Sequence, residues 1–280
     1  MRTRSLSALA YAAVFVAALA RGGWPWTGLV AAIAAIGTLE LYHLARMGGR
    51  RPSTLVGVAL APAAAMTIAG PPSGGDGVGP GLGAVLALGV IAAFAAQLAR
   101  PAAARAMDDW TVTVAGPVYL GCLLGHLIAL RALPGGQGLA WTALTLGLVW
   151  GNDSAAYLGG RAFGRRPFFP SLSPRKTLEG GLVGLAASMA IGWAAPALAG
   201  TAGGALAPLA GISPVTTAGL GLAVGILGPA GDLAESFLKR QVGAKDSGRW
   251  IPGHGGILDR VDSIAFAAPM VYYVALWMTR

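Results

Sequence analysis

The chain has 280 residues, of which 55% are apolar and only 11% are charged. A soluble domain carries roughly 25% charged residues, so this composition excludes a soluble enzyme, and the high apolar content excludes a disordered chain. In so apolar a chain, the formal net charge of +9 indicates membrane topology and anionic lipid headgroups. We therefore expect membrane lipids as partners and no nucleic acid. The single cysteine excludes a Cys-based zinc site.

Apolar runs long enough to cross a bilayer recur along the chain. A hydrocarbon core about 30 Å thick needs roughly 20 apolar residues in a helix. The runs predict an all-α fold, a polytopic transmembrane helical bundle of about nine spans. In chain order the spans are about 5–20, 26–45, 53–70, 81–100, 110–131, 138–159, 180–199, 205–230 and 262–278. The eighth is the least regular, because Pro208, Pro214 and Pro229 interrupt it.

We expect one integral membrane domain, 1–280, with spans one to five in 1–131 and spans six to nine, with the chemistry-bearing motifs, in 138–280. The loops between nine spans place 17 of the 20 basic residues on one side of the membrane. The positive-inside rule assigns that side to the cytoplasm. The prediction is a multi-pass protein of the cell membrane, with a cytoplasmic N-terminus, an outside C-terminus and a site facing the cytoplasm.

Two acidic pairs have a spacing that suits metal binding. Asp232 and Glu235 are three residues apart, as are Asp259 and Asp262, so each pair shares one face of a helix. Two such faces at the cytoplasmic ends of adjacent spans can converge on one divalent cation, and a carboxylate set favours Mg²⁺. Nearby cations complete the requirements of a metal–phosphate site; they are Lys239, Arg240, Lys245, Arg249 and Arg260.

Two further segments have the residues of an anion site. Gly253, Gly255 and Gly256 surround His254, and glycines let backbone N–H groups approach an anion closely, although such a loop alone is more often a plain turn. His254 is a candidate for phosphate binding or loop orientation, with a structural role as the alternative. The second segment contains Asn152, Asp153, Arg175, Lys176, Thr177 and Glu179. Each of these alone is more typical of a helix cap or a surface charge, but together on one membrane face they predict a functional site.

The motif Ser236-x-Leu-Lys-Arg240-x4-Lys245-Asp246-x-Gly248-x2-Ile251-Pro252-x-His254-Gly-Gly-Ile-x-Asp259-Arg260-Val-Asp262 resembles the signature of the phosphatidate cytidylyltransferases, also called CDP-diacylglycerol synthases. Gly231–Asp232, Asn152–Asp153 and the segment 173–180 are also similar to that family. Arg175, where lysine is common, and Pro229–Ala230 depart from its pattern.

The resemblance implies an enzyme of phospholipid biosynthesis that joins CTP and phosphatidic acid to give CDP-diacylglycerol and pyrophosphate. It implies Mg²⁺, with K⁺ as a candidate second ion, held by Asp232 and Asp259 with support from Asp246; it also implies a homodimer. The implied catalytic residues are Asp232, Asp246, Asp259, Lys239, Lys245 and His254. The implied substrate-binding residues are Asn152, Asp153, Ser173, Arg175, Lys176, Thr177, Glu179, Glu235, Ser236, Arg240, Gly255, Gly256, Arg260 and Asp262.

Two other classes of protein remain as alternatives. A CDP-archaeol-type synthase or a CTP-dependent polyprenol kinase would keep the metal and phosphate groups, but the complete His254–Gly–Gly motif favours the diacylglycerol lipid. A transporter of an anionic solute would carry charges near the bilayer midplane and repeat symmetry, whereas the charges here gather at one predicted face.

Overall fold

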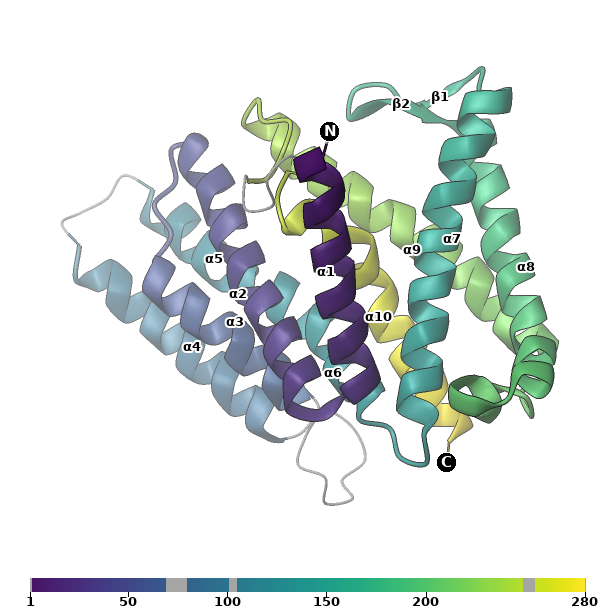
Figure 1. Ribbon diagram of the computed structural model, residues 1–280. Coiled ribbons are helices and arrows are strands. Elements are labelled where there is room, and N and C mark those ends of the chain that lie inside the picture. The colour runs from purple at the N-terminus through teal and green to yellow at the C-terminus, as the bar shows by residue number, and fades with distance from the viewer. Residues whose placement is uncertain (1, 69–79, 101–104, 249–254, 280) are drawn as a thin grey trace. The chain divides into compact units, whose positions relative to one another are not determined.

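The computed structural model describes residues 2–68, 80–100, 105–248 and 255–279, and these are mostly helical (Figure 1). The chain divides into two compact units. Unit 1 comprises Met1–Ala132 and Leu238–Val261, and unit 2 comprises Leu133–Phe237 and Asp262–Arg280. Helices α9 (Pro214–Gln241) and α10 (Leu258–Met278) each contribute residues to both units.

Unit 1 is built around α3, which contacts α2, α4, η1 and α6. Ala61, Ala64 and Ala65 of α3 are fully buried, and such small side chains let neighbouring helices approach closely. The π-helical turn η1 starts at Pro117, which has no N–H group to continue a regular helix. The elements are α1 (Arg2–Arg21), α2 (Gly23–Met47), α3 (Thr54–Ile68), α4 (Pro80–Leu98), α5 (Ala106–Gly116), η1 (Pro117–Cys122) and α6 (Leu123–Arg131).

Unit 2 contains two long helices, α7 (Gln137–Phe163) and α8 (Leu178–Ala202), that pack along each other. A two-stranded antiparallel hairpin, β1 (Pro167–Phe169) and β2 (Ser173–Thr177), joins them at one end (Figure 1). A short 3₁₀ helix, η2 (Gly204–Leu209), follows α8 and packs against both helices. Most of α9 and α10 completes the unit.

The helical membrane class is confirmed. By length and composition, six helices of the described residues can cross a membrane. They are Gly23–Met47, Gly81–Leu98, Ala106–Arg131, Leu178–Ala202, Pro214–Gln241 and Leu258–Met278. Helices α1, α3 and α7 coincide with three more predicted spans, although α3 has only 15 residues. The total of nine spans stays a prediction.

The structure differs from the sequence-based fold at two places. The hairpin stands where only helices and loops were expected, and Pro167, Pro170 and Pro174 explain why no helix forms there. The predicted eighth span, 205–230, is divided, since the chain forms η2 and then a separate helix α9 from Pro214 to Gln241. Proline is well suited to the first position of a helix, where its missing N–H costs nothing.

Candidate functional site

The first group of predicted site residues lies in unit 2, and we call it the Asp232 cluster: Asp153, Lys176, Asp232 and Ser236. Lys176 of β2 forms an ion pair with Asp232 of α9, whose other oxygen accepts a hydrogen bond of 3.3 Å from the Ser236 hydroxyl. The exposed side chain of Asp153 on α7 interacts electrostatically with both Asp232 and Lys176. Lys176 and Asp232 are 30% and 33% exposed, so incoming ligands can reach them.

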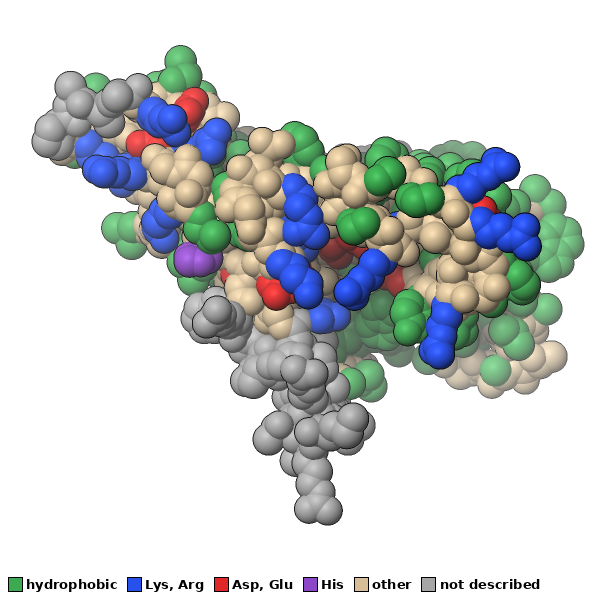
Figure 2. Space-filling model, turned by 90° about the horizontal axis from the view of Figure 1, so that it is seen from above, with side chains coloured by type: hydrophobic (Ala, Val, Ile, Leu, Met, Phe, Trp, Pro, Cys, Tyr) green, Lys and Arg blue, Asp and Glu red, His purple; other side chains and the backbone are tan. Residues whose placement is uncertain are grey.

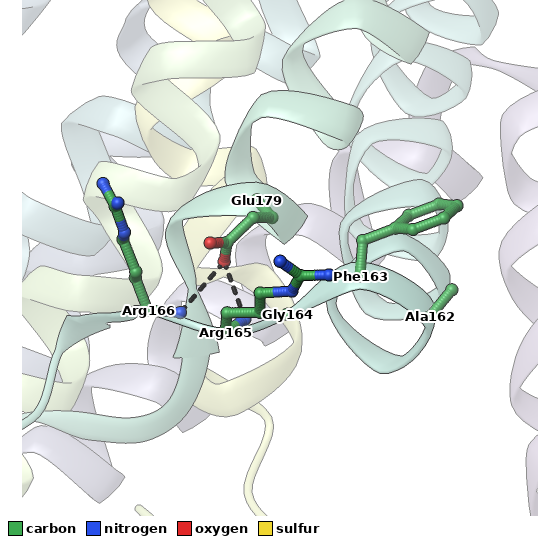
Figure 3. A pocket seen from close by; sticks show the side chains of 6 residues that line it. All are labelled: Ala162, Phe163, Gly164, Arg165, Arg166 and Glu179. Carbon is green, nitrogen blue, oxygen red and sulfur yellow. Dashed lines mark hydrogen bonds between the residues drawn. The ribbon is translucent and has the colours of Figure 1, made fainter.

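Two other predicted residues of this region stabilise the local fold. Thr177 is the N-cap of α8, because its hydroxyl accepts a hydrogen bond of 3.2 Å from the Gly180 N–H. The Glu179 carboxylate accepts hydrogen bonds from the backbone N–H groups of Arg165 and Arg166, at 3.0 and 3.2 Å. Figure 3 shows both bonds, which fix the end of α7 to the start of α8. A surface cavity of about 370 Å³ lies here, lined by Ala162, Phe163, Gly164, Arg165, Arg166 and Glu179.

Three predicted polar residues are buried in unit 2. Asn152 on α7 is 2% exposed, and neither its amide nitrogen nor its amide oxygen has a hydrogen-bond partner among the described residues. Glu235 is 1% exposed on α9, and Asp262 on α10 accepts a hydrogen bond of 2.7 Å from the Ser263 N–H. Ser173 is half-buried and Arg175 is exposed on β2.

The second group lies in unit 1, and we call it the Asp259 cluster. It joins three predicted residues, Lys239, Gly256 and Asp259, to Glu40 and Ser247, which the sequence did not predict as site residues. Lys239 of α9 forms an ion pair of 2.5 Å with one oxygen of Asp259. The other oxygen accepts hydrogen bonds from the Ser247 N–H and hydroxyl, both at 3.0 Å, and from the Gly256 N–H at 2.9 Å. Lys239 and Asp259 are only 9% and 13% exposed, so each charge depends on these partners.

The remaining predicted residues of this segment differ in their surroundings. Lys245, Asp246 and Arg260 are exposed. The Arg240 guanidinium donates a hydrogen bond of 2.7 Å to the Ala244 carbonyl, which closes the turn after α9. Gly255 has a φ of +84°, a conformation that favours glycine. His254 and Arg249, both named as candidates above, lie outside the described residues.

The carboxylates suit Mg²⁺ in type. Mg²⁺ in nucleotide sites is commonly bound by one or two carboxylates, with waters and substrate phosphates completing its coordination. Asp232 and Asp153 provide two such carboxylates in unit 2, and Asp259 provides one in unit 1. Among the residues that the structure describes, no group of three or more acidic, His or Cys side chains converges as a ready-made metal site.

Glu40 is a site residue that the motif analysis missed. It lies on α2, is 2% exposed, and accepts hydrogen bonds from Ser247, Ile257 and Leu258, more than 200 positions away. No local motif marks it. The available signal was an isolated acidic residue inside an apolar run, since ionisable groups in membrane segments are costly and mark function by default.

The face drawn in Figure 2 carries many Lys and Arg side chains, with acidic side chains among them. With its apolar helices and its two lysine–aspartate clusters, the chain is a helical membrane protein equipped to handle anionic substrates. The profile of the cytidylyltransferase family matches residues 2–278, and the chain belongs to this family.

Curated relatives agree with the family predicted from the motifs. The phosphatidate cytidylyltransferase of Synechocystis sp. is 31% identical over 295 residues, which cover 96% of this chain and 94% of the relative. The proteins of the same name from Brucella suis and Bacillus subtilis are 39% and 33% identical over 160 and 157 residues. The latter two alignments cover 56% of this chain and 54% and 55% of those relatives.

Proposed function

We propose that this chain transfers the cytidylyl group of CTP to phosphatidate, giving CDP-diacylglycerol and pyrophosphate. The similarity to a phosphatidate cytidylyltransferase along 96% of the chain carries this proposal. The structure adds chemical support, because Lys176 forms an ion pair with Asp232 and Lys239 forms one with Asp259.

The reaction requires two anions to meet. A phosphate oxygen of the lipid attacks the α-phosphorus of CTP, the bond to the β-phosphate oxygen breaks, and pyrophosphate leaves. Lys176 and Lys239 would reduce the repulsion by binding phosphate oxygens, which compete with their aspartate partners for the ammonium groups. The lipid phosphate is already ionised, so no strong general base is needed.

Mg²⁺ is part of the proposal, with Asp232 and Asp259 as its ligands and Asp246 in support. When bound, it would supply charge neutralisation and polarise a phosphoryl oxygen. The exposed side chain of Asp246 and the partly exposed side chain of Asp232 are accessible to a hydrated ion. K⁺ as a second ion and a homodimer are proposed on the family resemblance alone.

The proposal includes the membrane arrangement. Nine spans, a cytoplasmic N-terminus and a cytoplasmic site are supported by the 17 basic residues that this topology collects on one side. CTP is a charged, water-soluble substrate, so a site facing the cytoplasm would give it direct access. Phosphatidate would reach the same site from the bilayer.

The test is an assay of the purified protein in detergent with CTP, phosphatidic acid and Mg²⁺. CTP labelled at the α-phosphate should transfer its label to the lipid, whereas the γ-label should appear in pyrophosphate. Transfer of the γ-label to a polyprenol would instead identify a CTP-dependent kinase, and preference for an archaeol-type lipid would identify the related synthase. No lipid product from either label would overturn the proposal.

A further inference from the structure

Glu40 is a buried carboxylate in the N-terminal part of the chain, and it is far in sequence from the signature motifs. It lies inside α2 and is 2% exposed. Burying an ionised carboxylate is costly unless hydrogen bonds replace its hydration. Its partners therefore indicate its role.

Two of these partners belong to the start of α10. The backbone N–H groups of Ile257 and Leu258 donate to the two Glu40 oxygens, at 3.0 and 2.8 Å. The first N–H groups of a helix have no partner within the helix, and a negative charge at this end is favourable. Glu40, more than 200 positions earlier in the chain, thus caps α10 at the two residues directly before Asp259.

The third partner connects Glu40 to Asp259 itself. The Ser247 hydroxyl lies 2.9 Å from a Glu40 oxygen and 3.0 Å from an Asp259 oxygen. A hydroxyl has one proton, so Ser247 is shared between the two carboxylates. The Ser247 N–H also donates to Asp259. Glu40, Ser247 and Asp259 therefore form one continuous hydrogen-bonded unit.

Two glycines of the signature segment make room for this unit. A Cβ atom at Gly248 would overlap the Glu40 carboxylate, and one at Gly256 would overlap the Ser247 hydroxyl and Glu40. The Gly256 N–H already donates to Asp259. Gly256, which the sequence assigned to anion binding, and Gly248 are thus both required by the approach of Glu40.

We propose that Glu40 is a positioning residue for the reaction: it fixes Ser247 and the start of α10 so that Asp259 and Lys239 are correctly oriented. This inference rests on the proposed function. It assigns to the motif-free N-terminal part of the chain a direct role in assembling the site.

The first test compares Glu40→Gln with the parent. The variant keeps the shape but replaces one acceptor with an NH₂ group that cannot accept the backbone N–H. We expect turnover to fall at least tenfold and the Mg²⁺ concentration for half-maximal activity to rise. Trypsin should cleave after Lys245 several-fold faster, detected by mass spectrometry without any substrate. Asp108→Asn, an exposed acid on α5, is the matched control and should leave both readouts unchanged.

The second test is a double-mutant cycle that remains informative if Glu40→Gln folds poorly. Gly248→Ala should reduce activity and accelerate trypsin cleavage. Adding Glu40→Asp, whose side chain is one methylene shorter, to Gly248→Ala should partly restore both properties. Gly219→Ala, at a position with open space around it, is the control. Additive effects of the two changes would overturn the proposal, as would unchanged turnover and cleavage in Glu40→Gln. An inactive parent would overturn the proposed function instead, while the cleavage readout would still decide the role of Glu40.

Discussion

Lys239 and Lys176 each pair with an aspartate, but the two pairs differ in burial: Lys239 is 9% exposed and Lys176 is 30% exposed. An exposed ion pair is worth only ~0–1 kcal/mol. A cation that offsets phosphate charge in a partly dehydrated site contributes much more to the transition state. Removing the charge of each lysine therefore tests whether that lysine has a catalytic role or only a topological one.

We expect Lys239→Met and Lys176→Met to lower turnover or CTP affinity by roughly tenfold or more, about 1.4 kcal/mol, with the larger loss at Lys239. Methionine keeps the apolar stem and removes the charge. Steady-state kinetics at several CTP concentrations measure the effect, and Arg161→Met, an exposed cation on α7, is the control. Kinetics equal to the parent would leave the lysine only a topological role.

Asp259 and Asp232 are expected to be equally important for activity but not for stability. Asp259→Asn and Asp232→Asn should each lower activity by at least ~10²-fold, about 2.7 kcal/mol, since each removes a proposed metal ligand. Besides its ion pair, Asp259 accepts hydrogen bonds from the Ser247 and Gly256 N–H groups and shares the Ser247 hydroxyl with Glu40, whereas Asp232 accepts a hydrogen bond from the Ser236 hydroxyl. The midpoint temperature of thermal unfolding in detergent should therefore fall clearly for Asp259→Asn and little for Asp232→Asn. Near-normal activity at low Mg²⁺ in either variant would exclude that residue as a ligand and make Asp246 the next candidate.

At the scale of elements, the hairpin shows how local sequence and long-range packing together place a site residue. Three prolines prevent a helix between Pro167 and Pro174, and Thr177 then starts α8 as its cap. This places Lys176 at the junction, where it reaches Asp232 on α9, 56 residues away. The prolines are visible in the sequence, but the strand pairing and the choice of Asp232 depend on packing.

Close packing of the continuous helical segment 106–131 against α3 gives a prediction about stability. A Cβ atom at Gly121 would overlap the Ala61 carbonyl, whereas one at Gly83 in α4 meets no heavy atom of the described residues within 4 Å. We expect Gly121→Leu to destabilise the protein by roughly 1–3 kcal/mol, the usual cost of overpacking. The matched variant Gly83→Leu should be nearly neutral. Thermal unfolding in the same detergent compares them, and equal midpoints would contradict this packing.

At the scale of the whole molecule, the testable feature is topology. A reporter fused after Arg280 should behave as extracytoplasmic, because the nine-span arrangement that collects 17 basic residues in the cytoplasm ends outside. An alkaline phosphatase fusion should be active there, and a green fluorescent protein fusion should be dark. The opposite pair of results would remove one span, and α3, with 15 residues, would be the first to reconsider.

The sequence by itself determined the class of protein, the family and most helices. These properties are encoded locally: apolar runs identify membrane helices wherever they pack, and the signature motif occupies contiguous positions from Ser236 to Asp262. The spacing of three residues correctly placed Asp232 and Glu235 on α9, and Asp259 and Asp262 on α10.

Only the tertiary structure decided which charges become partners. Lys176 pairs with Asp232, Lys239 pairs with Asp259, and Glu40 caps α10 across more than 200 residues. The physical reason is that a buried charge takes whichever donors the packed backbone brings within about 3 Å, and no local pattern specifies which distant segment will supply them. For the same reason, Gly256 was predicted from the sequence to belong to an anion-binding loop, while the fold shows Gly256, together with Gly248, packed against Glu40.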